Sequence, residues 1–193
     1  MASILLVLCD PALSGHGTLS AFTDPDVLVD PGRTPDQGDY DLDRSEEQAR
    51  LDAAADPYIR YGVAYAICRE KLAEVIAMAD SGKPLAAQTA LDEYARNLDQ
   101  AWRAVVGIKR KSAPDIAGHF VNTLLEHRYI ASLYFSSMPS ATAKMLERLA
   151  ALATDYHAKA LPLTPYTFAE SIRLKEHEVL WSWEAARRAV RGQ

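Results

Sequence analysis

Residues 56–109 read DPYIRYGVAYAICREKLAEVIAMADSGKPLAAQTALDEYARNLDQAWRAVVGIK, and this stretch decides the fold. Asp56 suits a helix N-cap, and Pro57 suits the first helical position, where its missing N–H is not needed. Gly82 can end the helix, and Pro84 can begin the next one. Because the link between them is short, the stretch predicts two antiparallel helices that form a hairpin.

Each helix of this hairpin carries an apolar stripe. Apolar residues recur at steps of three and four, which keeps one face of a helix buried. The stripe residues are Tyr61, Tyr65, Cys68, Leu72, Val75, Ile76 and Ala79 in the first helix, and Leu91, Tyr94, Leu98, Trp102 and Val105 in the second. In the first helix, Glu70, Lys71 and Glu74 fall on the face opposite the stripe.

The rest of the chain repeats this plan. Prolines stand at positions 57, 84, 114, 139 and 165, each where a helix could begin. Further helices are expected over about residues 114–137, 139–160 and 165–190, with a short one over 44–55. The sequence therefore predicts an all-α fold, a bundle or stacked hairpins of about five long antiparallel helices.

Residues 1–43 are expected to form an extended acidic arm before a helical domain over residues 44–193. Two apolar runs, SILLVL at 3–8 and VLV at 27–29, have the length of short strands. Residues 24–56 hold three Arg and eleven Asp or Glu, a net charge of 3 − 11 = −8 that is typical of a solvated linker. Asp39, Asp41 and Asp43 have the spacing of a calcium loop, but arginines at 44 and 50 replace its turn glycine and bidentate glutamate.

Composition excludes several classes of protein. The chain has 193 residues, 49% of them hydrophobic, which suits one globular domain. Its net charge of −5 disfavours nucleic-acid binding. The apolar run at 3–8 is too short to span a bilayer, and no Lys or Arg precedes Arg33, so we expect no transmembrane segment, no signal peptide and a cytoplasmic protein. Cys9 and Cys68 form no disulfide framework, and Cys68 is expected in the core.

The familiar catalytic patterns are missing. No histidine follows a carboxylate at the Glu-x-x-His spacing of di-iron bundles, and HExxH, a Gly-rich phosphate loop and G-x-S-x-G are absent. No cofactor is expected. His127 continues the stripe of Phe120 and Leu124 by one turn, which is typical of a partly buried histidine bonded to a neighbouring helix. The candidates for a metal or ligand pocket are His119, Glu126, His127 and His157.

Several segments resemble an uncharacterised all-helical domain family of bacteria, found mainly in actinobacteria and Chloroflexi. They are KLAEVIAMA at 71–79, Gly82 with Lys83, the Ala90-Leu91…Tyr94 stretch, LLEH at 124–127 and the turn at Met138-Pro139. The resemblance covers residues 55–160 and implies an all-α fold. It implies no activity, because the function of the family is unknown.

Three hypotheses follow for the function. The first is a non-enzymatic helical interaction or assembly protein, whose N-terminal arm engages a protein partner or a neighbouring subunit, for example by adding a strand to a sheet edge. The alternative is a helical bundle that binds a metal or small ligand in a pocket formed by histidines and a glutamate. The third, an enzyme with a site that no motif reveals, ranks last.

Overall fold

The computed structural model describes residues 30–191, and over this range the chain is all-α, with no strand. The helices are α1 (Tyr40–Ala53), α2 (Pro57–Asp80), α3 (Pro84–Gly107), α4 (Ala113–Phe135), α5 (Ser140–Ala160) and α6 (Ala169–Arg191), with two short 3-10 helices, η3 (Leu161–Leu163) and η4 (Tyr166–Phe168), before α6. The predicted all-helical fold is confirmed. The short strands predicted at 3–8 and 27–29 lie outside the described residues.

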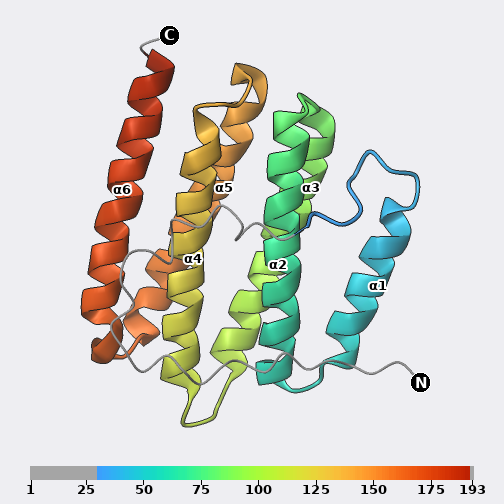
Figure 1. The fold of residues 1–193 in the computed structure, drawn as a ribbon. Coiled ribbons are helices and arrows are strands. Elements are labelled where there is room, and N and C mark those ends of the chain that lie inside the picture. Colours follow the sequence, from blue (N-terminus) through green and yellow to red (C-terminus); the bar gives the residue numbers. More distant parts are fainter. Residues whose placement is uncertain (1–29, 192–193) are drawn as a thin grey trace.

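The helices form a two-layer bundle. Helices α6, α4, α2 and α1 stand side by side in one layer, and α5 and α3 lie behind them (Figure 1). The two main hairpins are α2 with α3 and α4 with α5, and they meet mostly through α5, which contacts both α2 and α3. Helix α6 packs on α4, whereas α1 packs on α2 at the opposite edge of the layer.

The predicted signals set the ends of the α2–α3 hairpin. The Asp56 carboxylate accepts hydrogen bonds from the backbone N–H groups of Tyr58 at 2.9 Å and Ile59 at 3.3 Å, which satisfies two donors of the first turn. Gly82 adopts a φ of 65°, the left-handed conformation that ends a helix, and Pro84 begins α3. The hairpin predicted from residues 56–109 is therefore confirmed.

The core lies between the two layers and is built from the predicted stripes. Tyr94, Leu98, Phe120 and Leu124 are almost completely buried, together with leucines of α5. Cys68 is also buried, with a free thiol, as predicted. Among residues 30–191 no helix combines the length and the apolar content that crossing a bilayer requires.

Three boundaries differ from the prediction. Helix α1 begins at Tyr40 rather than at residue 44, so the predicted division between arm and helical domain falls inside α1. Pro139 precedes α5 as its N-cap residue instead of opening the helix. After Pro165 the chain first forms the 3-10 turn η4, and α6 begins only at Ala169.

Candidate functional site

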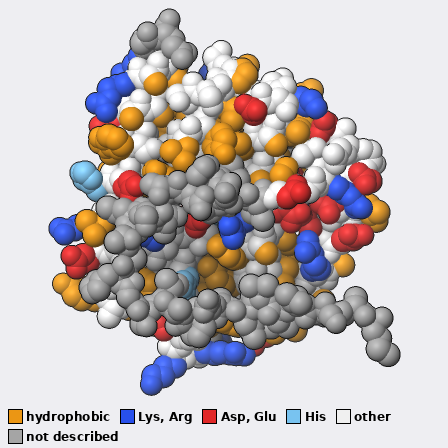
Figure 2. All heavy atoms as spheres, in the orientation of Figure 1, with side chains coloured by type: hydrophobic (Ala, Val, Ile, Leu, Met, Phe, Trp, Pro, Cys, Tyr) orange, Lys and Arg blue, Asp and Glu red, His pale blue; other side chains and the backbone are white. Residues whose placement is uncertain are grey.

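The interface beneath α1 is the most unusual environment among the described residues, because charged side chains replace the apolar ones that join the other helices. Within α1 only Tyr40, Glu47 and Leu51 are buried. Positions 40, 47 and 51 are separated by steps of seven and four residues, so they share the helix face that meets α2. Acidic side chains gather over α1 at the right of Figure 2. The face that α1 presents to the bundle thus combines Tyr40 and Leu51 with a buried carboxylate, that of Glu47.

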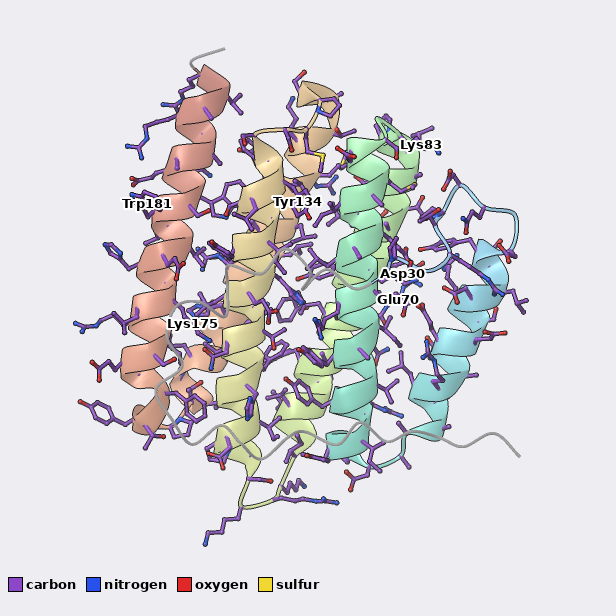
Figure 3. The ribbon with its side chains drawn as sticks, in the orientation of Figure 1. Asp30, Glu70, Lys83, Tyr134, Lys175 and Trp181 are labelled. Carbon is purple, nitrogen blue, oxygen red and sulfur yellow. The ribbon has the colours of Figure 1, made fainter. Side chains whose placement is uncertain are left out.

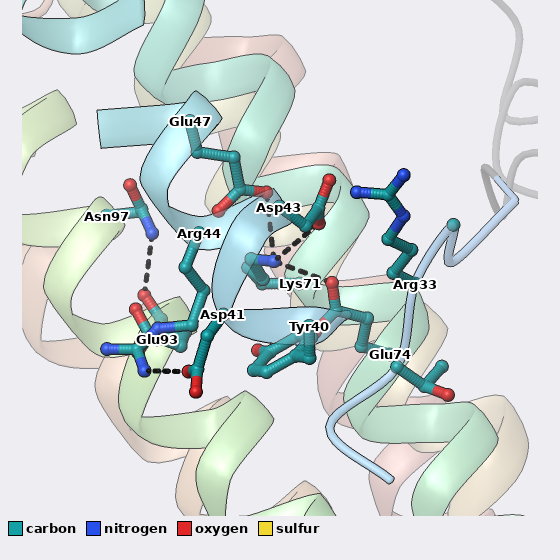
Figure 4. Close-up of polar contacts among 12 residues, drawn as sticks. Arg33, Tyr40, Asp41, Asp43, Arg44, Glu47, Lys71, Glu74, Glu93 and Asn97 are labelled. Carbon is teal, nitrogen blue, oxygen red and sulfur yellow. Dashed lines mark hydrogen bonds and ion pairs between the residues drawn. The ribbon is translucent and has the colours of Figure 1, made fainter. Parts of the chain in front are cut away.

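Lys71 of α2 is the centre of this interface, and its side chain is completely buried. Its ammonium group lies 2.7 Å from a carboxylate oxygen of Glu74 and 2.9 Å from one of Glu47, and 3.8 Å from one of Asp43 (Figure 4). It also lies 5.0 Å from the centre of the Tyr40 ring, within the range of a cation–π contact. One buried cation therefore joins α2 to three residues of α1.

Glu74 completes the Lys71 cluster. Its second carboxylate oxygen accepts a hydrogen bond from the Tyr40 hydroxyl at 3.0 Å. Burial raises the pKa of Glu74 to about 7, although Lys71 and Tyr40 favour its ionised form. For Lys71, burial opposes the charged form, but its hydrogen bond to Glu74 and its ion pair with Glu47 outweigh burial and raise its pKa. The lysine is therefore charged at neutral pH, whereas the Glu74 carboxyl changes from its protonated to its ionised form near this pH.

A second group of charges connects α1 to α3. Arg44 of α1 lies 2.7 Å from Glu93 of α3, whose side chain is only 6% exposed. The other carboxylate oxygen of Glu93 is paired with Arg96 at 2.7 Å, and Arg44 also bonds Asp41 at 3.2 Å. Asn97 donates a hydrogen bond to the backbone carbonyl of Glu93 (Figure 4). The buried carboxylate of Glu93 is thus held by two arginines from different helices.

A polar cleft of about 600 Å³ opens between α1 and α3 beside these charges. Its lining is polar except at Ala49 and Leu51: Asp41, Arg44, Ser45, Glu47, Gln48, Asp52, Glu93, Arg96, Asn97 and Gln100. Ligand pockets are usually mostly apolar, and this one is not. The cleft lies where α1 leaves part of α3 uncovered. Along its edge, the ion pair between Arg44 and Glu93 joins the two helices.

Three carboxylates at this interface lie close enough to be considered as metal ligands. Oxygens of Asp43, Glu47 and Glu70 lie within 4.8 Å of one another. However, the Lys71 ammonium contacts two of the three, so a cationic side chain already stands among them. Burial also raises the pKa of Glu70, and the nearby Asp43 adds to this effect. The geometry is that of a lysine-centred ion-pair cluster.

The four candidates predicted from sequence do not gather into a site. His119 is exposed on α4, with its ring 6.1 Å from that of Phe168, and Glu126 is half-buried on the same helix. His127 is completely buried, and its Nδ1 lies 2.9 Å from the Tyr94 hydroxyl. Burial lowers the pKa of His127 to about 3, so the imidazole is neutral. The predicted bond to a neighbouring helix is present, and His127 is buried more deeply than the partial burial that was predicted.

His157, the last of the four, lies on α5 with its Nε2 atom 3.4 Å from a Glu176 carboxylate oxygen. Burial lowers its pKa. Within residues 30–191, the only group of three or more potential metal ligands is the carboxylate trio described above. Metal or ligand binding by the predicted histidines stays a prediction.

The sequence placed Lys71 and Glu74 on the face of α2 opposite the apolar stripe, but it did not reveal that this face is covered, and both residues are fully buried. Helix α2 has neighbours on more than one side, so its polar face is covered by α1. The signal in the sequence was the spacing of Tyr40, Asp43 and Glu47, which places a tyrosine and two carboxylates on one face of a helix.

With this geometry in view, comparison with known proteins adds one match. Residues 32–127 match the family model described as Domain of unknown function (DUF5667). The match is consistent with the predicted resemblance to an uncharacterised family, but it begins earlier, before α1, and ends within α4. No curated protein and no solved structure matches the chain. The charged interface between α1, α2 and α3 lies entirely inside the matched residues.

Proposed function

We propose that this chain is a non-enzymatic helical interaction or assembly protein, in which the N-terminal arm engages a protein partner or a neighbouring subunit. The observation that carries the proposal is the attachment of α1, the helix that joins the arm to the bundle. It is fixed by directional ion pairs at Lys71 and Glu93 rather than by a broad apolar surface. Buried ion pairs add little net stability. We infer that in this chain they hold α1 in one position on the bundle.

The loop before α1 supports the same proposal. Asp36 pairs with Lys83 at the start of α3 at 2.5 Å, and Arg33 pairs with Asp39 at 3.0 Å. Asp30, the first described residue, lies beside Glu70 on the face of α2, and this pair of like charges opposes the attachment that the two ion pairs provide (Figure 3). Residues 30–53 thus give the preceding arm a fixed point of departure from the bundle. Such an anchor suits an arm whose apolar run at 3–8 reaches another chain.

The test is removal of residues 1–29. The cut ends before Asp30 because Asp36 and Tyr40 contact the bundle and should be kept. We expect the helical circular-dichroism spectrum to stay unchanged. Light scattering should show fewer subunits per oligomer, or a co-purifying protein partner should be lost. A control removes the two C-terminal residues 192–193 and should leave assembly intact. If the shortened protein keeps both its number of subunits and its protein partners, the arm has no role in assembly.

A further inference from the structure

Helix α6 forms the edge of the bundle opposite α1 (Figure 1). Its buried residues face α4 and are few: Ile172, Val179, Ser182, Trp183 and Ala186. Trp183 donates a hydrogen bond to the Arg128 carbonyl at 3.0 Å, which fixes the rotation of α6 about its axis. The face of α6 that points away from α4 is therefore well defined.

That outer face carries large apolar side chains. Residues in a helix are rotated by about 100° each, so Leu174, His177 and Trp181 form one line on the side opposite the buried Val179. Trp181 is 62% exposed and Leu174 is 49% exposed, and His177 is exposed between them. Figure 3 shows Trp181 on α6. Tryptophan is enriched at binding hot spots, so the exposed Trp181 with Leu174 two turns away makes this face a candidate contact surface.

The charges at the two ends of this line indicate the partner. Glu170 lies on the outer face near the start of α6, and Arg188 lies on it near the end, and both are exposed. A parallel copy of α6 would set Glu170 against Glu170 and Arg188 against Arg188. An antiparallel copy, related by a two-fold axis at the level of Val179, sets each Glu170 against Arg188 of the other copy. The same axis sets each Trp181 against His177 of the other copy.

We propose that the outer face of α6 binds the same face of a second copy of this chain, antiparallel and with two-fold symmetry. The contact is self-complementary, as two-fold interfaces must be. It contains two Trp181–His177 stacks near the axis and two Glu170–Arg188 ion pairs at the rim. The same axis sets Leu174 at the level of Glu184 of the other copy, whose charge stays in contact with solvent at the edge of the contact. A single helix pair of this length buries no more than about the 800 Å² per partner of a standard interface, so the dimer is expected to dissociate at about micromolar concentrations.

The experiment is sedimentation equilibrium of the full chain, from roughly micromolar to roughly millimolar protein. Trp181→Glu should weaken dimerisation at least about thirtyfold, as expected for loss of a hot-spot tryptophan. Leu85→Glu is the matched control, because Leu85 is 85% exposed at the start of α3, away from this face, and should leave the dimer unchanged. Circular dichroism checks that both variants are folded.

A charge exchange tests the antiparallel register. Arg188→Glu alone should weaken the dimer, and Glu170→Arg combined with Arg188→Glu should restore it. A full chain that stays monomeric throughout, a dimer that survives Trp181→Glu, or a charge exchange that restores nothing would each overturn the proposal. The arm is a separate matter: removing residues 1–29 should leave this dimer in place, so failure of the arm proposal and failure of this one are distinguishable.

Discussion

Replacing Lys71 by methionine should loosen α1 more than any surface substitution. Methionine keeps much of the length of the side chain but removes the charge that holds Glu47 and Glu74, whose side chains are 4% and 0% exposed. Breaking a buried ion pair by removing one partner typically costs about 3–5 kcal/mol, because the remaining charge is left unpaired. For a chain of this size each kcal/mol lowers the melting temperature by about 2–4 °C, so the expected loss is about 6–20 °C if α1 and the bundle unfold together.

The assay is a thermal melt at pH 8 combined with hydrogen exchange measured by mass spectrometry. The amides of α1 should exchange much faster in Lys71→Met, whereas those in the centre of α3 should change less. If α1 detaches before the bundle melts, the exchange effect persists while the loss in melting temperature is smaller. The control is Lys83→Met, which removes a half-exposed lysine from a surface pair with Asp36 and should cost at most about 1 kcal/mol. Equal effects of the two substitutions, in both assays, would refute the reasoning.

Two further predictions concern Glu74 and the glycines. Because the folded protein holds the pKa of Glu74 at about 7, above the ordinary 4.5, its contribution to stability is complete below about pH 4.5 and is lost as pH rises through 7. The melting temperature of Glu74→Gln minus that of the parent protein should therefore increase from pH 5 to pH 8.5. A difference that does not change with pH would contradict a raised pKa of Glu74. Gly118→Ala should destabilise by about 1–3 kcal/mol, because its Cβ would lie 3.0 Å from the Phe168 ring. Gly62→Ala, which meets nothing within 4 Å on an exposed helix position, should stabilise by about 0.5–1 kcal/mol in the same denaturant titration, and the opposite order would contradict the packing.

The parts of the fold that the sequence predicted are those decided locally. Asp56, Pro57 and Gly82 act on the backbone within a few residues, so the ends of α2 could be inferred without knowing its neighbours. The stripes of three and four residues identified the core, because burial of one helix face follows from helix geometry alone. The same argument predicted partial burial of His127, which is buried more deeply than that.

The charged interface could not be predicted in this way. A pattern of apolar and polar residues assigns one buried face to each helix, whereas α2 buries Lys71 and Glu74 on a second face, beneath α1. Whether a polar face meets water or a complementary polar face depends on a helix distant in the sequence. The acidic run that predicted a solvated linker contains Glu47, whose burial depends on the lysine opposite it.

The positions of the charges in α1 also explain how so polar a helix keeps one register on α2. Glu47 faces Lys71, and the residues three positions before and after Glu47 are both arginines, Arg44 and Arg50. A slip of three residues in either direction would bring an arginine to the buried ammonium, and like charges at a few ångströms in a protein interior repel strongly.

A slip of four residues fails for a different reason. In one direction it places the carboxylate of Glu47 where Leu51 is buried, and in the other it places Leu51 against Lys71 and leaves the ammonium without that partner. The first alternative buries the unpaired charge of Glu47, which costs several kcal/mol. The second breaks the 2.9 Å pair between Glu47 and Lys71, although Lys71 keeps its 2.7 Å pair with Glu74 of the same helix, and it moves Leu51 out of its buried position. The observed register keeps both the Lys71–Glu47 pair and the burial of Leu51. An apolar interface of the same size would tolerate such slips more readily. The charged interface therefore favours a single position of α1 on α2.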